Sequence, residues 1–273
     1  MNFNTDAFDD KKLLINSDFV ELLKFNGIDS AQKLWDLQGE AVKKILKQRG
    51  TERVILKTPD GGQLEAYIKR YSKDPIKETV KQAFSLKFRI FDAFHEWKAL
   101  RAFHKTGLDT MIPMAVASPG KGLSCNLTLG ILDYTKAAIL FENFTPADHS
   151  RKSKLIKSIA EIAGKMHSAG FAHQDFYLVH MFVREKENDK IYLIDLQRLI
   201  MQTNLSHRWR VKDLGQLLYS AAPFVSEFDI KRFWITYCKF AGKNFLRDKS
   251  LVKLIKSKAA KITARDKKKA SKK

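Results

Sequence analysis

Two histidines, a glutamine and an aspartate interrupt the largely apolar stretch GFAHQDFYLVHMFV at residues 170–183. His173 and Asp175 are two residues apart, and His180 follows five residues after Asp175. Such groups are costly to bury without partners, so this stretch must fold around hydrogen bonds that satisfy them. Both a functional site near the core and a structural turn held by satisfied hydrogen bonds remain open at this point.

Asp195 extends the pattern, because it follows the apolar run IYLI as a side chain follows the end of a strand. A hairpin of residues 182–184 and 191–194 would bring His180 and Asp195 together. An imidazole and a carboxylate in one small volume can bind a divalent ion. Asp175, one loop away, would then be placed to accept a proton or to orient a hydroxyl.

An earlier part of the chain predicts a β-hairpin followed by a helix. The strand-like runs RVILK (53–57) and QLEAYIKRY (63–71) are joined by TPDGG, which is rich in turn residues. The stretch FDAFHEWKALRAFHKTGL (91–108) has apolar residues at three- and four-residue steps, which predicts a helix. Lys69 on the second strand and Glu96 in the helix would complete a phosphate site, and two ordinary surface charges are the alternative.

Strands dominate the middle of the first half of the chain, and helices dominate the second half. Further strands are predicted at 124–133, 137–144 and 190–199. A helix is predicted at 150–170, ending at Gly170. Its apolar face consists of Leu155, Ile159, Ile162 and Met166.

The composition is that of a folded soluble protein, with 273 residues, 44% apolar and 29% charged. No run approaches the roughly 18 apolar residues of a membrane-spanning helix. The start, MNFNTDAFDDKKLL, lacks the apolar segment of a secretory signal. Cys125 and Cys238 are too few for a disulfide framework, so we expect reduced core thiols and a cytoplasmic location.

Positive charge is the dominant bulk property, with a formal net charge of +20. Residues 253–273 alone contain nine Lys and one Arg against one Asp, a net +9. A segment with this charge attracts nucleic acid, anionic lipid or another acidic surface, unless it serves only as a solubilising tail.

Several motifs together resemble the protein-kinase-like fold. The loop His173-Gln174-Asp175 is similar to the H-R-D catalytic loop, EAYIKRY to the strand with the kinase lysine, and FHEWKAL to the helix with its glutamate. AAILFENF looks like the hinge whose backbone would meet adenine near Glu142. More narrowly, HQDFYLVHMFV, YLIDLQRL and RWRVKDLGQLLYSA resemble the lipopolysaccharide core heptose kinase family of Gram-negative bacteria, from about Gln38 to Ala222.

The resemblance implies an α+β, bilobal protein-kinase-like fold with a small N-lobe, made of an antiparallel sheet plus one helix, and a mainly helical C-lobe. The expected parts are an N-terminal extension (1–37), the N-lobe (38–144), the C-lobe (145–250) and a basic C-terminal tail (251–273). The implied activity is phosphorylation of a sugar (heptose) hydroxyl of the lipopolysaccharide inner core, with ATP and Mg²⁺ or Mn²⁺. The implied location is the inner face of the cytoplasmic membrane, where the tail would meet anionic lipid and the core glycolipid would be the partner; no nucleic acid is expected.

Site roles also follow from the resemblance, residue by residue. Asp175 would be the catalytic base, and Lys69 paired with Glu96 would hold the nucleotide phosphates. The other implied roles are metal binding by His180 and Asp195, adenine contact near Glu142, substrate contact by Arg198 and Arg210, and structural support by Asp213 and His173. Two alternatives stay open: Arg198 neutralises phosphate charge or binds substrate, and Arg210, in HRWRVK, binds an anion or lies at a solvated helix start.

The sequence departs from the kinase pattern in two places. No G-x-G-x-x-G precedes Lys69, and only Gly50 lies near the expected loop, so phosphates would meet Lys47, Arg49 or backbone N–H groups there. Gln174 replaces the usual arginine, which indicates no control by a phosphorylated activation segment.

Two other functional classes remain as alternatives. A kinase for a protein or another small molecule is one, but Asp195 and Asp213 lie only 18 residues apart, no A-P-E follows, and Tyr177 stands where Ser/Thr kinases carry Lys. A pseudokinase or basic nucleic-acid-binding module is the other. The absent glycine loop favours a pseudokinase, whereas the retained charged residues argue against it, and no nucleic-acid motif is present.

Overall fold

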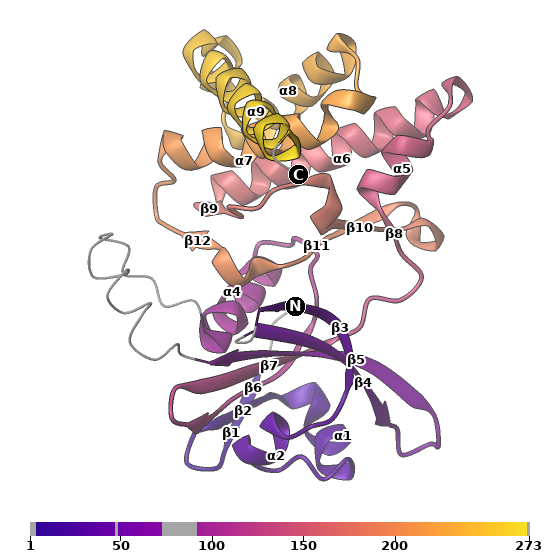
Figure 1. The fold of residues 1–273 in the computed structure, drawn as a ribbon, viewed down its shortest axis with the longest axis vertical. Coiled ribbons are helices and arrows are strands. Elements are labelled where there is room, and N and C mark those ends of the chain that lie inside the picture. The colour runs from indigo at the N-terminus through magenta and orange to yellow at the C-terminus, as the bar shows by residue number, and fades with distance from the viewer. Residues whose placement is uncertain (1–3, 47–48, 73–91, 272–273) are drawn as a thin grey trace. The chain divides into compact units, whose positions relative to one another are not determined.

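The computed structural model describes residues 4–46, 49–72 and 92–271. The chain divides into two compact units (Figure 1). The sheet unit comprises residues 1–105 and 111–132, and the helical unit comprises residues 106–110 and 133–273.

One antiparallel sheet forms the centre of the sheet unit. Its described strands are seven, in the order β1-β2-β6-β7-β5-β4-β3. Their bounds are β1 Thr5–Phe8, β2 Leu13–Asn16, β3 Glu40–Leu46, β4 Arg49–Lys57, β5 Gln63–Ser72, β6 Pro113–Gly120 and β7 Leu123–Leu129. The predicted hairpin is confirmed: β4 and β5 pair from Arg49↔Tyr71 to Lys57↔Gln63 across the TPDGG turn.

Residues 4–37 are an integral layer of the sheet unit. Strand β2 pairs with β6, and helices α1 (Val20–Phe25) and α2 (Ala31–Trp35) cover one sheet face. That face buries Ala66 and Ile68 of β5 together with Leu23 and Leu34 of the two helices. The division of the chain therefore differs from the expected one, which set residues 1–37 apart and extended the N-lobe to residue 144.

Helix α4 (Ala93–Lys105) lies against the opposite sheet face, as the apolar pattern at 91–108 predicts. Trp97 of this helix packs with Tyr71 and Val116 of the sheet. Because side chains alternate along a strand, β5 contributes Ala66 and Ile68 to one core cluster and Tyr71 to the other. The sheet is thus covered on both faces.

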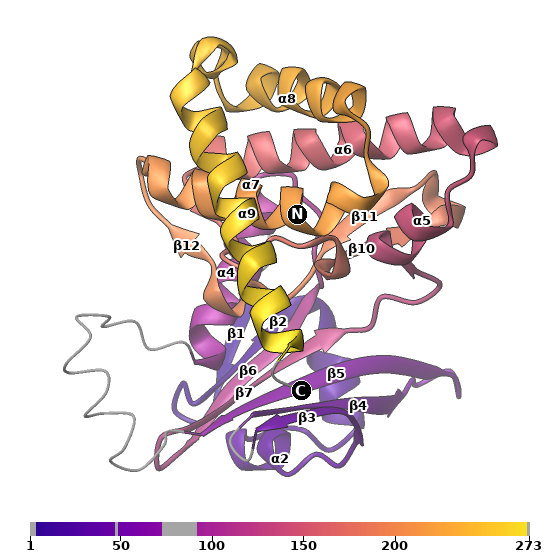
Figure 2. The ribbon, with the colours of Figure 1, turned by 45° about the horizontal axis from the view of Figure 1, so that its top comes forward.

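Helices dominate the described part of the helical unit (Figures 1 and 2). Its helices are α5 (Ala137–Asn143), α6 (His149–Ser168), α7 (His207–Ala221), α8 (Glu227–Ala241) and α9 (Lys249–Ala270). The helix predicted at 150–170 is confirmed, and α8 packs along it. Leu155, Ile159 and Met166 of α6 are buried, and Gly170 takes a positive φ of 82° just after the helix.

Short strands place the motifs of the helical unit. They are β8 (Thr135–Lys136), β9 (Phe171–Ala172), β10 (Met181–Arg184), β11 (Lys190–Leu193) and β12 (Ile200–Met201). The predicted hairpin is formed by β10 and β11, with Met181 opposite Leu193. The strand expected over 190–199 ends at Leu193, because the chain turns at Asp195.

One expectation for the helical unit is corrected. Residues 137–144 are not a strand: Ala137–Asn143 form α5, whose Ala137, Leu140 and Phe141 are buried at helical spacing. The basic tail is helix α9, which packs along α7 through Leu251, Ile255, Ala259 and Ile262 (Figure 2). The two cysteines are free and buried, as expected, and burial raises the pKa of the Cys125 thiol to about 12.

Candidate active site

A buried ion pair joins β5 to α4 in the sheet unit. Lys69 Nζ lies 2.9 Å from Glu96 Oε1, and the Glu96 side chain has no exposed surface. Tyr71 donates its hydroxyl to Glu96 Oε2 at 2.6 Å, and Asn126 Nδ2 donates to the same oxygen at 3.4 Å. The structure therefore brings together the two residues that the sequence predicts as a pair.

Strand periodicity explains how this pair assembles. Lys69 and Tyr71 are two residues apart in β5, so both lie on the sheet face that α4 covers. A buried carboxylate is tolerated only when charge and hydrogen bonds compensate its lost hydration, and three side chains do so for Glu96. Sequence reasoning missed Tyr71 and Asn126, although the Lys-x-Tyr spacing was a usable signal for Tyr71.

The sequence predicts a phosphate contact at Lys47, Arg49 or the backbone near Gly50. Gly50 is the second residue of β4 and lies opposite Arg70 of β5. Lys47 and the side chain of Arg49 lie outside the described residues. The phosphate contact here stays a prediction.

Glu142 lies in a helix and not in the extended hinge that the sequence predicts. Glu142 is an exposed residue of helix α5, whereas the hinge prediction requires extended backbone. Glu142 is the penultimate residue of α5, where carbonyl groups have no partner within the helix, so an adenine contact by the backbone near Glu142 stays a prediction.

The carboxylate of Asp213 holds the loop 173–175 of the helical unit. Asp213 Oδ2 accepts from the His173 N–H at 2.7 Å, and Oδ1 accepts from the Gln174 N–H at 2.8 Å. The Asp213 side chain is fully buried on α7, and His167 Nε2 lies 3.3 Å from Oδ2. Gln174 has a positive φ of 71°, an uncommon conformation for this residue type, so the loop depends on these fixed bonds. This is the geometry that structural support by Asp213 requires.

His173 connects the loop to the end of β11. Its Nε2 donates to the carbonyl oxygen of Ile194 at 2.8 Å, while its Nδ1 accepts from the Asp175 N–H at 3.3 Å. Burial lowers the pKa of His173, which favours the neutral ring that this donor and acceptor pair requires. The side chain therefore fixes the backbone of Asp175 rather than acting on a substrate.

The β10–β11 hairpin brings His180 and Asp195 to one end. Ile194 N–H donates to the His180 carbonyl at 2.9 Å, and Asp195 follows with a positive φ of 66°. His180 donates from Nδ1 to the Asp175 carbonyl at 2.6 Å. In a neutral imidazole this leaves the Nε2 lone pair for another partner, which is the chemistry of a metal ligand.

Within residues 4–46, 49–72 and 92–271, no group of three or more His, Cys, Asp or Glu side chains could hold an ion. His180 and Asp195 fit as a two-residue set, because an imidazole and a carboxylate suit a divalent ion whose other ligands are phosphate oxygens and water.

Asp175 is half-buried and faces a cation. Arg198 Nη1 lies 3.1 Å from Asp175 Oδ2. Gln174 Nε2 donates to the Arg198 carbonyl oxygen, and Lys212 Nζ donates to Gln174 Oε1 at 3.1 Å. Sequence reasoning identified Asp175 and Arg198 but missed Lys212, although it stands beside Asp213 in the same motif.

The predicted substrate contact at Arg210 is wrong. Arg210 is only 7% exposed, and it donates to the Tyr237 hydroxyl and to the His167 carbonyl, both at 3.2 Å. Its guanidinium also lies over the Phe245 ring. Its partners come from α8 and α6, so Arg210 supports the core of the helical unit, as does the buried His167.

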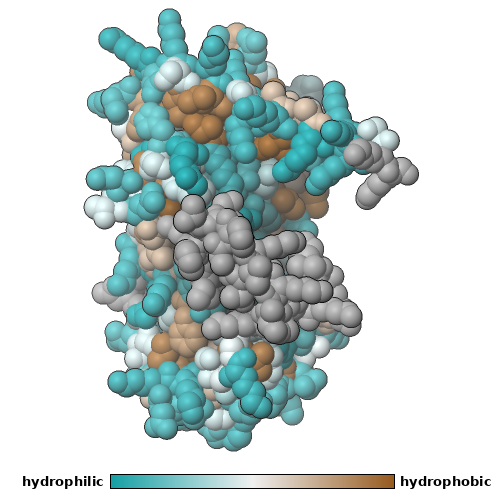
Figure 3. Space-filling model, turned by 60° about the vertical axis from the view of Figure 1, so that its left-hand side comes forward, coloured by the Kyte–Doolittle hydropathy of each residue, from teal (hydrophilic) through white to brown (hydrophobic). Residues whose placement is uncertain are grey.

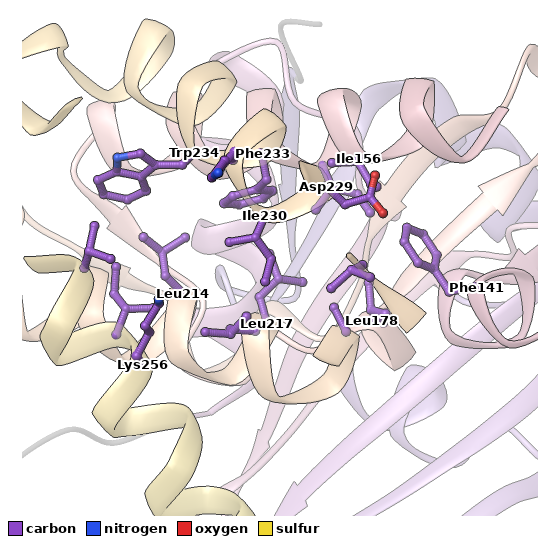
Figure 4. Close-up of a pocket in the computed structure, with 17 residues that line it drawn as sticks. Phe141, Ile156, Leu178, Leu214, Leu217, Asp229, Ile230, Phe233, Trp234 and Lys256 are labelled. Carbon is purple, nitrogen blue, oxygen red and sulfur yellow. The ribbon is translucent and has the colours of Figure 1, made fainter. Parts of the chain in front are cut away.

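A cavity of about 240 Å³ opens among helices α5 to α9 of the helical unit (Figure 4). Its walls are almost entirely apolar, and Ile156, Leu178, Leu214, Leu217 and Trp234 are among the residues that line it. None of the predicted site residues lines it. The apolar lining distinguishes this cavity from the Asp175 loop, whose side chains are polar or charged.

The two units together define a protein-kinase-like fold: a sheet unit with a buried Lys–Glu pair, and a helical unit with a His-x-Asp loop braced by a helix aspartate. The chain belongs to the lipopolysaccharide kinase (Kdo/WaaP) family, whose model matches residues 32–237. Membership makes the chain an ATP-dependent phosphotransferase and confirms the resemblance and the fold class stated from the sequence.

Curated relatives cover most of the chain. The lipopolysaccharide core heptose(I) kinase WaaP of Escherichia coli is 29% identical over 254 residues, which covers 88% of this chain and 94% of the relative. The kinase of the same name from Pseudomonas aeruginosa is 26% identical over 267 residues, covering 93% and 97%. A solved structure described as WaaP in complex with acyl carrier protein has a TM-score of 0.71 at 25% identity, covering 91% of this chain and 98% of that one.

Proposed function

We propose that the chain transfers a phosphoryl group from ATP to a heptose hydroxyl of the lipopolysaccharide inner core. The observation that carries the proposal is the setting of Asp175: a half-buried carboxylate on a loop that Asp213 braces, with a guanidinium 3.1 Å away. The names of the relatives, which match 88% and 93% of the chain, supply the substrate class.

Each unit contributes its own residues to the proposed reaction. Asp175 orients the acceptor hydroxyl and takes its proton as the phosphoryl group moves, while Arg198 offsets the negative charge that develops there. Lys69 holds the nucleotide phosphates, and Glu96 fixes the lysine in place. His173 and Asp213 keep the loop in its conformation.

His180 and Asp195 would hold a divalent ion, Mg²⁺ or Mn²⁺. When bound, such an ion neutralises charge on the phosphate oxygens. The bond from His180 Nδ1 to the Asp175 carbonyl supports this role, since it aims the ring and leaves Nε2 for the ion. His180→Asn should retain some metal-dependent activity, because an amide oxygen is also a ligand for hard cations; complete loss with unchanged folding would contradict the assignment.

The substrate is tested by mass spectrometry of lipopolysaccharide from cells with and without this chain. Loss of the chain should remove a unit of about 80 Da, the mass of one phosphate, from the core fragment. Restoring the wild-type chain should return it, and restoring Asp175→Ala should not. Unchanged core phosphate in the deficient cells would favour the alternatives, a kinase for another small molecule or protein, or a pseudokinase.

The purified enzyme tests the role of Asp175. Asp175→Ala should lower kcat at least a hundredfold, in line with about 10²–10⁴-fold for a positioned acid or base. Its ATP affinity should stay within about twofold, because the phosphate-binding residues are elsewhere. An equal loss of ATP binding would mean that the role of Asp175 is misassigned.

We propose that helix α9 makes the membrane contact. No described helix is both long enough and apolar enough to cross a bilayer. Figure 3 shows a face on which hydrophilic side chains surround separate apolar patches. Lysines on the exposed side of α9 would therefore hold the protein at the inner face of the cytoplasmic membrane by charge, at about 1 kcal/mol per lysine.

Substitution is a better test of this contact than deletion, because α9 is packed on α7. Changing four exposed lysines of α9 to Gln (Lys253, Lys261, Lys267 and Lys268) should weaken binding to anionic vesicles at least tenfold. A matched variant with four exposed lysines changed elsewhere (Lys12, Lys98, Lys121 and Lys157) should bind nearly as wild type. Equal losses of vesicle binding in the two variants would contradict a specific role of α9 in the membrane contact.

An acyl carrier protein is a second proposed partner. The neighbouring structure is described as a complex with this protein, and the apolar cavity of the helical unit has the character that an acyl chain requires. Filling the cavity with Val225→Trp should abolish calorimetric binding of an acylated carrier protein and leave catalysis on a soluble acceptor unchanged. Retained binding would exclude the cavity as the acyl site.

A further inference from the structure

Helices α7 and α9 approach each other closely at Gly215. A Cβ atom at this position would lie 2.5 Å from Lys258 Cγ, 2.7 Å from Lys258 Cβ and 3.4 Å from the Ile255 carbonyl oxygen. Glycine permits this approach, so the aliphatic stem of Lys258 lies over α7. Lys212 is three residues before Gly215 and so lies on the same side of α7. The C-terminal helix therefore carries a lysine to the neighbourhood of the catalytic loop.

Lys212 forms a hydrogen bond with Gln174 of that loop. Its Nζ donates to Gln174 Oε1 at 3.1 Å, and Gln174 Nε2 donates to the Arg198 carbonyl oxygen. A glutamine amide can accept from one partner and donate to the other, whereas an arginine has no acceptor for a lysine. Gln174, which replaces the usual arginine of the kinase pattern, thus holds the ammonium group of Lys212 near Asp175.

Positive charge exceeds negative charge in this neighbourhood. Burial lowers the pKa of Lys212, the charges of Arg198 and Lys258 lower it further, and the carboxylates of Asp175 and Asp213 oppose this. Asp175 is paired with Arg198, and Asp213 accepts from two backbone N–H groups. Within the described residues, no carboxylate forms an ion pair with Lys212 or Lys258. An anion entering this cluster would supply the counter-charge.

We infer that Lys212 and Lys258, with Arg198 beside them, form a binding site for an anionic group of the acceptor, a carboxylate or a phosphate on a sugar next to the reacting hydroxyl. The inference rests on the proposed function, because it adds acceptor recognition to the same loop. The two lysines bind the acceptor's charge, and Asp175 acts on its hydroxyl. A neutral sugar of the same shape is therefore a poor substrate, which gives the enzyme selectivity for acidic core sugars.

The test compares Lys212→Met and Lys258→Met with Lys157→Met, a control at an exposed lysine of α6. Methionine keeps an unbranched stem and removes the charge. The acceptor is deacylated core oligosaccharide in three forms: untreated, carboxyl-reduced and phosphatase-treated. Each cluster variant should raise the KM for the untreated acceptor about tenfold, within the range for hydrogen bonds to charged groups. The kcat and the KM for ATP should stay within about twofold.

The treated acceptors identify the anion. If it is a carboxylate, carboxyl reduction should raise the wild-type KM and abolish the difference between wild type and Lys258→Met. If it is a phosphate, phosphatase treatment should do so instead. A tenfold difference that survives both treatments would overturn the inference, and so would a KM equal to that of the control or a raised KM for ATP.

Calorimetric binding of the untreated oligosaccharide separates this inference from the proposed function. Lysine-dependent binding without phosphorylation by the wild type would overturn the proposed function alone. Phosphorylation with equal affinity in the cluster variants and the control would overturn the inference alone. Absence of both binding and phosphorylation would overturn both.

Discussion

The functional side chains of the two units are held in place by different means. In the sheet unit, Lys69 is positioned by one buried side-chain carboxylate, which three side chains contact. In the helical unit, Asp175 is positioned through its backbone, by a loop whose N–H groups bond to Asp213 and His173. Charge fixes the first site and backbone hydrogen bonding fixes the second. The two should therefore fail in different ways, the first through lost ligand affinity and the second through lost folding.

The largest effect is expected from Asp213→Ala in the helical unit. The substitution leaves two buried backbone N–H groups without an acceptor, at about 1–3 kcal/mol each, so the free energy of unfolding should fall by about 3–5 kcal/mol. Urea denaturation measures the change. Glu161→Ala, which removes a surface pair with Lys165, should cost about 0.5 kcal/mol or less. A loss below about 1 kcal/mol for Asp213→Ala would remove the contrast between the units.

Glu96→Gln should lower the free energy of unfolding less than Asp213→Ala does, and it should weaken ATP binding more. It removes the charge opposite Lys69, so stability should fall by about 2 kcal/mol and the KM for ATP should rise at least tenfold. A double-mutant cycle with Lys69→Met isolates the pair. Additive stability losses would show that the two residues are not coupled, which contradicts the role of charge in the sheet unit.

Acid should weaken the helical unit through its buried histidines. Burial lowers the pKa of His167 and His173 below the ordinary value of 6.5, so the unfolded chain binds more protons than the folded chain as pH falls. Their contribution to stability is complete above the unfolded pKa and is lost as pH falls towards the folded values. The expected loss is about 1–1.5 kcal/mol between pH 7 and pH 6. His167→Gln should reduce this slope in denaturation curves; an unchanged slope would exclude His167 as a source.

Tyr71→Phe should have the smallest effect of the four. It removes one of the hydrogen bonds to Glu96 and keeps the ring packed on Trp97, so the expected cost is about 1 kcal/mol. Thermal unfolding measures it. The control is Tyr134→Phe, which makes the same change at a residue that is 37% exposed. A loss as large as that of Glu96→Gln would mean that the hydroxyl, rather than the lysine charge, holds the carboxylate.

Local patterns were sufficient for the elements that place the motifs. The TPDGG turn, the helix around Glu96 and the hairpin before Asp195 each depend on periodicity and turn residues within about 20 residues. AAILFENF misled because a short apolar run is typical of both a buried strand and a buried helix. The spacing of Ala137, Leu140 and Phe141 was the available helical signal.

Contacts between distant segments account for what the sequence could not predict. Arg210 and Lys212 are neighbours in one basic motif, and only the packing of α8, which brings Tyr237 to Arg210, decides which of them is buried. Likewise, nothing local in residues 13–16 indicates a partner at residues 115–117. The place of residues 4–37 in the sheet unit follows from that pairing and from the packing of α1 and α2 on the sheet.

The pairing of β2 with β6 also affects how the chain folds during its synthesis. Leu13 pairs with Ala117, so the first apolar strand leaves the ribosome about 100 residues before its partner. At about 5–20 residues per second, β2 waits for about 5–20 s with Leu13 and Ile15 unburied. Slowing translation between these strands would lengthen the wait and promote aggregation of the nascent chain, whereas a chaperone bound to the first 20 residues would suppress it.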